Sequence, residues 1–270
     1  MKDPFKFSWQ PELENPSLVV TWEEDAGKVG LKVIDYLNKK IKGKFFCEIE
    51  PVGFFSLGGV AIKNDTAQFP ESKFYTIERK GLVIFIGSEP QFEQYKFLKA
   101  ILDVAEHYGQ VKELYTISGT ISSVAHTIPR RILTVFNQPE FQRRLRGYDL
   151  LDMTWEGRPH INSFLLWEAQ RRNIPGVSLW PEIPFYLATS KDPQAIKLVL
   201  SFLNKRFNLG MNLGELDLEI KRQNEKIAQL REENPEINKS IGLLENGFSL
   251  SEEEQLKLAK EVYELLEKRG

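Results

Sequence analysis

Residues 173–186 read Asn-Ile-Pro-Gly-Val-Ser-Leu-Trp-Pro-Glu-Ile-Pro-Phe-Tyr, and this stretch decides how the fold is interpreted. The apolar run at 177–180 predicts a short buried strand, and Pro181 and Pro184 lack the amide proton that sheet pairing needs. We therefore expect the strand to end there and Glu182 to lie in a stiff loop at its exit. In open α/β sheets, ligands and partners bind at strand exits, although a rigid loop is also a good connector.

Short apolar runs and amphipathic segments alternate through residues 1–210. Strands are expected at 18–21, 45–49, 74–78, 82–86, 113–117 and 132–136. Helices are expected at 27–41, before residue 108, near residue 139, and after Asp192-Pro193, which is an N-cap followed by proline in the first turn. The pattern predicts a three-layer α/β fold with a largely parallel sheet, helices on both faces and an antiparallel pair inserted around 45–79.

The composition changes near Gly210, which marks a predicted boundary between an α/β core at 1–210 and a helical hairpin at 211–270. Of the Phe, Tyr and Trp residues, only Phe248 and Tyr263 lie beyond it. An a/d seam and a second helix that begins with a capping box at Ser251 carry the apolar residues Leu213, Leu216, Ile220, Ile227, Leu230, Leu258, Val262 and Leu265. Asn234-Pro235, Gly242 and Asn246-Gly247 punctuate the interval between the two helices. Two interrupted heptads are too few for an independent coiled coil, so we expect the hairpin to pack on itself, on the core or on another subunit.

The composition excludes several classes of protein. A net charge of -2 argues against a nucleic-acid binder, which usually presents a basic face. The single cysteine, Cys47, cannot form an internal disulfide and indicates a reducing compartment. The first residues contain no apolar signal region, and no apolar run is long enough to span a bilayer. We therefore expect a cytoplasmic protein that binds neither nucleic acid nor membrane.

A group of polar residues follows the predicted strands and would meet at one rim of a parallel sheet. The candidates for this rim are Glu23, Glu24, Asp25, Ser118, Gly119, His126, Arg158, Glu182 and Tyr186. Carboxylates close to a histidine or an arginine could do acid/base chemistry, because like charges raise one pKa while a cation holds another group ionised. Acidic residues before helices are, however, usually caps and dipole partners, and that interpretation carries more weight here.

No cofactor or metal is expected from the motifs. The three histidines show neither the i, i+4 spacing nor the Cys/His pairing of a metal site. The glycine-rich stretch at 53–59 lacks the lysine of a phosphate loop, and Ser118 lacks the flanking glycines of a nucleophile elbow. The catalytic residues, if there are any, cannot be named from the sequence.

Several motifs resemble, in order and spacing, a known protein family. They are Ala26-Gly-Lys-Val-Gly30, Ser118-Gly-Thr120, Ala125-His-Thr-Ile-Pro129, Gly157-Arg-Pro-His-Ile-Asn-Ser-Phe-Leu-Leu-Trp-Glu-Ala-Gln-Arg-Arg-Asn-Ile-Pro-Gly176, Glu182-Ile-Pro-Phe-Tyr186 and Asp192-Pro-Gln-Ala195. Together they are similar to the proteasome-assembly-chaperone-two family of archaea and bacteria, over residues 15–208.

The resemblance implies a sheet related to those of purine nucleoside phosphorylases and peptide hydrolases. It also implies homo- or hetero-oligomers that assist proteasome assembly or dock on the proteasome surface. Archaeal relatives that dock by their tails end in a hydrophobic residue, tyrosine and any residue. This sequence ends Glu267-Lys-Arg-Gly270, and its last tyrosine is Tyr263, so tail docking is not expected here.

The sequence thus favours a self-associating, non-catalytic interaction protein of the assembly-chaperone type, whose partners are itself and the proteasome or another protein complex. The alternative is an enzyme that uses a pocket at the strand rim, such as a hydrolase, a phosphorylase or an ATP-dependent carboxylate ligase. A water-excluding pocket that brings Glu182 and a cation to a common point would favour the enzyme. A filled rim together with an exposed apolar surface would favour the interaction protein.

Folding should need neither a metal nor a nucleotide. The melting temperature is expected to stay unchanged after chelator treatment and after addition of ATP with magnesium, as measured by differential scanning fluorimetry. A ligand present at 100 times its dissociation constant would stabilise the native state by about 2.7 kcal/mol and raise the melting temperature visibly. A reproducible rise with ATP would move the ligase hypothesis ahead of the chaperone-like one.

Overall fold

The computed structural model describes residues 4–56, 59–63, 65–154 and 160–268. Its helices are α1 (Val29–Ile41), α2 (Gln94–Glu106), α3 (Pro139–Arg144), α4 (Ile161–Arg171), α5 (Pro193–Phe207), α6 (Gly214–Glu233), α7 (Pro235–Glu245) and α8 (Glu252–Tyr263). Short helical turns are η1 (Ala26–Lys28), η3 (Glu78–Lys80), η4 (Phe185–Leu187) and the π-helical turn η5 (Glu264–Lys268). None of the described helices is long and apolar enough to cross a membrane.

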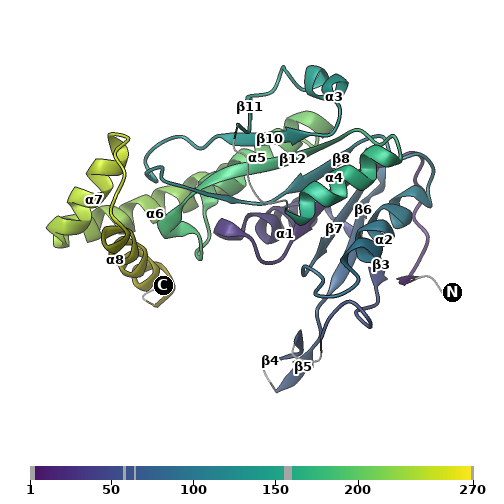
Figure 1. Ribbon diagram of the computed structural model, residues 1–270, viewed down its shortest axis with the longest axis horizontal. Helices are drawn as coiled ribbons and strands as arrows, with labels where there is room; N and C mark the ends of the chain where they lie inside the picture. The colour runs from purple at the N-terminus through teal and green to yellow at the C-terminus, as the bar shows by residue number, and fades with distance from the viewer. Residues whose placement is uncertain (1–3, 57–58, 64, 155–159, 269–270) are drawn as a thin grey trace. The chain divides into compact units, whose positions relative to one another are not determined.

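The strands form a mixed sheet with helices on both sides, so the predicted α/β class is confirmed (Figure 1). The strands are β1 (Phe5–Phe7), β2 (Ser17–Trp22), β3 (Lys44–Ile49), β4 (Ala61–Lys63), β5 (Thr66–Gln68), β6 (Ser72–Ile77), β7 (Leu82–Gly87), β8 (Leu114–Ile117), β9 (Thr120–Ser122), β10 (Ile132–Phe136), β11 (Leu150–Asp152) and β12 (Gly176–Pro184). The order in the main sheet is β1-β3-β6-β7-β2-β8-β12-β10-β11, and β9 pairs with β12.

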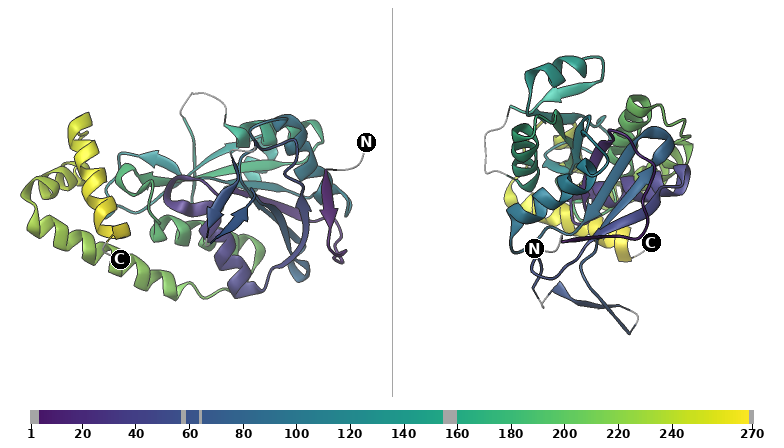
Figure 2. Two further views of the ribbon diagram at one scale, coloured as in Figure 1. Left: turned by 90° about the horizontal axis from the view of Figure 1, so that it is seen from below. Right: turned by 90° about the vertical axis from the view of Figure 1, so that its right-hand side faces the viewer.

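The sheet has a parallel centre and an antiparallel arm. Strand β2 runs parallel to both β7 and β8, and β12 runs parallel to β8. Strands β1, β3 and β6 pair antiparallel with one another in that order, and β6 joins β7 antiparallel. The predicted antiparallel pair around 45–79 is therefore β3 with β6. A separate hairpin, β4 with β5, lies between them in the sequence and outside the main sheet (Figure 2).

The chain forms two compact units. The first contains Met1–Glu24, Ile34–Ile117 and Thr134–Leu179, and the second contains Asp25–Val33, Ser118–Leu133 and Trp180–Gly270. Strand β12 therefore begins in the first unit and ends in the second. The sequence-based boundary near residue 210 stays a prediction.

An aromatic core fills the first unit between the sheet and α2. Phe85 of β7 lies 4.9 Å from Phe74 of β6 and 6.0 Å from Phe97 of α2, measured between ring centroids. Trp22 at the end of β2 is fully buried, and its indole N–H donates to Asn162 Oδ1 at the start of α4 (2.7 Å). Side chains of β2 and β7 alternate between the two faces of the sheet, and those on one face pack against α2 and α4.

Strand β12 does not end at its prolines, so the prediction that Glu182 lies in a loop was wrong. Residues 182–184 pair in parallel with β9, a strand of three residues that is too short to be recognised from its sequence. A proline removes only its own donor, and the amide of Glu182 still donates to the carbonyl of Arg131 (3.0 Å). Glu182 therefore lies in a strand, paired with Thr120.

The expected C-terminal helices are present as α6 and α8, and the interval between them is itself a helix, α7. Asn234 caps it by accepting from the amides of Glu236 and Ile237, and Pro235 occupies the first turn. The Asn-Pro pair was interpreted as a break, but it is the same helix-start signal as Asp192-Pro193. Helix α7 buries Ile237, Ile241 and Leu244 and contacts both α6 and α8.

The predicted seam residues are mostly buried inside the second unit. Those fully or nearly buried are Leu216, Ile227, Leu230, Leu258 and Val262, whereas Leu213, Ile220 and Leu265 are half-buried. Helix α8 contacts η4 as well as α7, and η5 contacts α6. The seam thus finds its apolar partners within the same chain.

Candidate functional site

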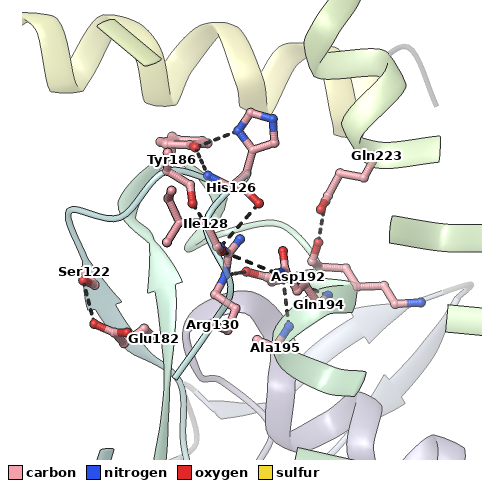
Figure 3. A network of polar contacts seen from close by, with 12 residues as sticks. Ser122, His126, Ile128, Arg130, Glu182, Tyr186, Asp192, Gln194, Ala195 and Gln223 are labelled. Carbon is pink, nitrogen blue, oxygen red and sulfur yellow. Dashed lines mark hydrogen bonds and ion pairs between the residues drawn. The ribbon is translucent and has the colours of Figure 1, made fainter. Parts of the chain in front are cut away.

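The predicted site residues fall into separate parts of the structure. Asp25, Ser118, Gly119, His126, Glu182 and Tyr186 belong to the second unit, and Glu23 and Glu24 belong to the first. Arg158 lies outside the described residues. Of this second-unit group, Figure 3 draws His126, Glu182 and Tyr186 within a network of polar contacts.

Asp25 connects the start of α1 with the segment after β8. Its carboxylate accepts from the amide of Gly119 (2.9 Å) and from the amide of Gly30 in the first turn of α1 (3.1 Å). Burial raises the pKa of this carboxyl to about 6, and the backbone hydrogen bonds oppose that rise. A Cβ atom at Gly119 would lie 2.1 Å from the carbonyl oxygen of Ala26, so only glycine lets the two backbone segments come this close. These contacts support the cap interpretation of Asp25.

A buried ion pair, Arg130 with Asp192, lies at the centre of the network. Arg130 Nε donates to Asp192 Oδ2 (3.1 Å), and the two side chains are 1% and 0% exposed. Asp192 Oδ1 also accepts from the amides of Gln194 and Ala195, which begin α5. Asp192 was predicted as the N-cap of this helix, and the structure confirms that role.

The rest of the Arg130 side chain holds the loop that precedes it. Its Nη1 atom donates to the carbonyl oxygens of Ala125 (3.1 Å) and Ile128 (2.8 Å), so Figure 3 shows Arg130 between this loop and the N-terminal end of α5. Arg130 was not among the predicted site residues. The sequence offers one signal for it, the Arg130-Arg131 pair directly before the apolar run at 132–136. In an extended chain the side chains of two successive residues point to opposite faces, so one arginine of such a pair points inward.

His126 and Tyr186, both predicted site residues, contact each other. The amide of His126 donates to the Tyr186 hydroxyl (2.6 Å), and Nδ1 of the same histidine lies 2.9 Å from that hydroxyl. The hydroxyl can accept from the amide and also share a hydrogen bond with Nδ1, because its oxygen has two lone pairs and one proton. Burial, followed by the positive charges of Arg130 and Arg231, lowers the pKa of His126 to about 4. Burial also raises the pKa of Tyr186, so both groups are neutral at pH 7.

Glu182 is held by an arginine in a fork-to-fork arrangement. Arg131 Nε donates to Glu182 Oε2 (2.6 Å), and Arg131 Nη2 donates to Oε1 (2.7 Å). The hydroxyl of Ser122 on β9 adds a longer contact to Oε1 (3.3 Å). The carboxylate is buried while the arginine is exposed, so the pair clamps β12 to the segment before β10.

Glu23 and Glu24 line a cavity of about 700 Å³ in the first unit, at the carboxyl end of β2. The hydroxyl of Ser88, which follows β7, donates to Glu23 Oε2 (2.6 Å). Among the described residues, no group of three or more His, Cys, Asp and Glu side chains is arranged to hold a metal ion. The predicted rim residues of the two units therefore have different surroundings.

The second-unit residues use their polar atoms in structural contacts. Asp25 and Asp192 accept from backbone amides at the starts of α1 and α5, Glu182 pairs with Arg131, and His126 contacts the Tyr186 hydroxyl. A general base needs a pKa near the operating pH and a free path to substrate. The contacts described here are those of caps and clamps.

Three features define the class of this protein. They are a mixed α/β sheet with a parallel centre, a glycine turn after its first long strand, and a capped α5. The chain belongs to the PAC2 family, whose model matches residues 24–231. The family expected from the sequence motifs is therefore confirmed.

Three relatives illustrate the similarity. An uncharacterised protein of Methanocaldococcus jannaschii is 26% identical over 236 residues, which cover 84% of this chain and 88% of that protein. The crystal structure of Pyrococcus furiosus PbaB, an archaeal proteasome activator, superposes with a TM-score of 0.69 and 20% identity over 85% of this chain and 100% of that one. Pyrococcus furiosus PbaA, an archaeal homolog of proteasome-assembly chaperone, has a TM-score of 0.64 and 18% identity over 85% of this chain and 97% of that one.

Replacing Glu182 should weaken the second unit. Glu182→Ala is expected to lower the free energy of unfolding by about 1 to 3 kcal/mol, because it removes two charge-assisted hydrogen bonds to a buried carboxylate. The control is Glu140→Ala, whose ion pair with Arg143 is exposed on both sides and should change the free energy by less than about 0.5 kcal/mol. Urea denaturation measures both. Equal denaturation midpoints for the two variants would contradict the clamp.

The acid sensitivity of the second unit should depend on His126 and Asp25 in opposite directions. The folded pKa of His126 is depressed, so the stability of its neutral form is complete above pH 6.5 and is lost as the pH falls towards 4. The folded pKa of Asp25 is raised, so its contribution is complete below pH 3.8 and is lost as the pH rises through about 6. The two contributions oppose each other over the same pH window.

Single substitutions should therefore separate the two contributions. His126→Asn is expected to make the unfolding free energy less sensitive to acid than in the wild type between pH 6.5 and 4. Asp25→Asn should make it more sensitive, while its amide oxygen still accepts the same backbone bonds. Urea titrations at several pH values measure the slopes, and parallel slopes for all three proteins would contradict the assignment.

Proposed function

We propose that this protein is a self-associating, non-catalytic interaction protein of the cytoplasm, which acts in the manner of proteasome assembly chaperones. The observation that carries the proposal is an aromatic stripe on the outer face of α4. Helix α4 is amphipathic, and its inner face buries Leu165 and Ala169 in the core of the first unit. On the outer face, however, Phe164 and Trp167 are 47% and 49% exposed.

The stripe continues onto α2, which packs against α4. Tyr95 of α2 is 43% exposed, and its ring centroid lies 6.1 Å from that of Trp167. The guanidinium of Arg171 lies 5.0 Å from the centroid of the Trp167 ring. Tryptophan, tyrosine and arginine are the residue types that dominate protein–protein binding energy.

A network of charged residues holds Tyr95 and Arg171 of the stripe in place. Glu168 accepts from the Tyr95 hydroxyl (2.6 Å) and from Arg172 Nε (3.0 Å), and Arg172 also binds Asp103 and Glu106 of α2. The hydroxyl of Tyr95 accepts from Arg171 Nη1 (2.6 Å). Because these contacts fix the exposed side chains in advance, less conformational entropy is lost on binding.

The seam of the C-terminal helices is already buried within its own unit, so we assign self-association to the stripe on α4 and α2. The first partner is a second copy of this chain, because an aromatic patch on one helix can meet its own copy across a two-fold axis. PbaB is an archaeal proteasome activator and PbaA is a homolog of proteasome-assembly chaperone. By analogy with these relatives, the further partner of this protein is the proteasome or another protein complex.

Removing the stripe should dissociate the oligomer. Phe164→Ala with Trp167→Ala is expected to weaken self-association by about 30-fold or more, since one interface hot spot is worth about 2 kcal/mol. Light scattering after size-exclusion chromatography measures the mass, and circular dichroism checks that the fold survives.

The matched control is Phe248→Ala with Leu256→Ala, which removes similarly exposed apolar side chains from the C-terminal region. These changes should leave the mass unchanged. If the control dissociates the oligomer and the α4 variant does not, the interface lies on the C-terminal helices instead.

A further inference from the structure

Helix α2 reaches solvent along one narrow face, and the charges on that face are segregated by sign. From Tyr95 onward, the exposed or half-buried positions of the helix are Tyr95, Lys96, Lys99, Asp103 and Glu106. From Lys96 on they follow one another at intervals of three or four residues, which places them on the same side of a helix. The N-terminal half of this face therefore carries two lysines, and the C-terminal half carries two acids.

This order of charges does not stabilise α2 itself. The helix dipole favours acidic residues in the first turn and basic residues in the last. Helix α2 has no acidic residue in its first turn and no basic residue in its last turn. Its lysines and acids stand in the order that the dipole disfavours, so the order requires another physical reason.

The two lysines have no carboxylate partner within the chain. Lys99 Nζ lies 5.8 Å from the centroid of the Tyr95 ring, and Lys96 Nζ lies 6.0 Å from that of Phe54. Among the described residues, no carboxylate lies within ion-pair distance of either ammonium group. Two positive charges therefore remain at the surface for a partner to neutralise.

The acids at the other end of the face outnumber the arginines that bind them. Arg172 binds Asp103 (2.7 Å) and Glu106 (2.5 Å) through Nη1 and Glu168 (3.0 Å) through Nε. Arg171 adds one more positive charge beside Glu168 (3.4 Å), so three carboxylates meet two guanidinium groups. The side chain of Asp103 is 47% exposed, and its carboxylate is open to a further cation.

We propose that α2 packs against α2 of a second copy in the antiparallel direction, so that Lys99 faces Asp103 and Lys96 faces Glu106 of that copy. A two-fold axis at right angles to a helix reverses the helix direction in the second copy, and positions equally far from the crossing point then face each other. Lys99 and Asp103 lie two positions to either side of Ile101, and Lys96 and Glu106 lie five positions to either side. A single axis beside Ile101 therefore forms both pairs.

This pairing rests on the proposed self-association and specifies its geometry. Tyr95 shares the exposed face of α2 with Lys99, and its ring lies 6.1 Å from that of Trp167, so the charged face continues the aromatic stripe. Charged pairs at the rim of an interface fix orientation more than they add affinity. The aromatic side chains thus supply the binding energy, and the segregated charges exclude a parallel arrangement, which would place like charges together.

Charge reversal followed by mixing tests the pairing, with the mass measured by light scattering. Lys96→Glu with Lys99→Glu, and separately Asp103→Lys with Glu106→Lys, should each weaken self-association by about 10-fold or more, because like charges then meet and the two-fold axis repeats every pair. An equimolar mixture of the two variants should recover self-association. Every pair in the mixed dimer again joins opposite charges.

Two further variants separate the interface from the fold. Lys239→Glu with Lys260→Glu reverses two exposed lysines on α7 and α8 and should leave the mass of the oligomer unchanged. Within the Lys96/Lys99 variant, Asp103→Asn with Glu106→Gln removes the repulsion without placing a positive charge beside Arg172. It should restore part of the lost affinity, while circular dichroism checks that each variant is folded.

The outcomes distinguish this pairing from self-association itself. A constant wild-type mass of 31.2 kDa would contradict both. If the wild type associates and reversal of Lys96 and Lys99 leaves that association unchanged, the antiparallel pairing is overturned and self-association stands. The pairing is also overturned if neither the mixture nor the neutralised variant associates more strongly than the Lys96/Lys99 variant alone.

Discussion

The buried ion pair between Arg130 and Asp192 is the interaction on which the second unit depends. Through Asp192 it begins α5, and through Arg130 it fixes the carbonyl groups of the loop at 125–128. The amide of Asp192 also donates to the carbonyl of Gly27, a residue with a φ of 71°. Removing one partner of such a pair leaves an uncompensated buried charge, which typically costs about 3 to 5 kcal/mol. Three segments distant in the sequence are thus joined at one point.

The positions of the predicted site residues follow from this pair. Arg130 holds the loop that presents His126 to Tyr186, and its neighbour Arg131 reaches Glu182 on β12. The polar groups after the parallel strands are therefore used to connect β9, β12 and α5.

The sequence was sufficient for elements whose periodicity is strong and local. The run at 82–86 and the Asp192-Pro193 cap correspond to β7 and to the start of α5. The extension of β12 through Pro181 and Pro184 could not be foreseen, because it requires pairing with β9, a distant strand of three residues. Arg130 could not be recognised as a buried residue, because its neutralisation by Asp192 is a tertiary contact over 62 positions.

Two surfaces of the first unit were equally hidden in the sequence. Phe164 and Trp167 are ordinary apolar residues in the sequence, and only the packing of α4 shows that they face outward. Glu48 of β3 and Lys73 of β6 lie opposite each other and line one cavity only when the two strands pair. Local patterns identify elements well, whereas a surface made from several elements requires their arrangement.

The mass of the unmodified protein in solution tests the central claim most directly. Static light scattering across the micromolar range should give a mass at least twice that of the 31.2 kDa chain, with dissociation only at the lowest concentrations. A constant mass of 31.2 kDa over the whole range would contradict self-association and would leave the aromatic stripe on α4 without its proposed partner.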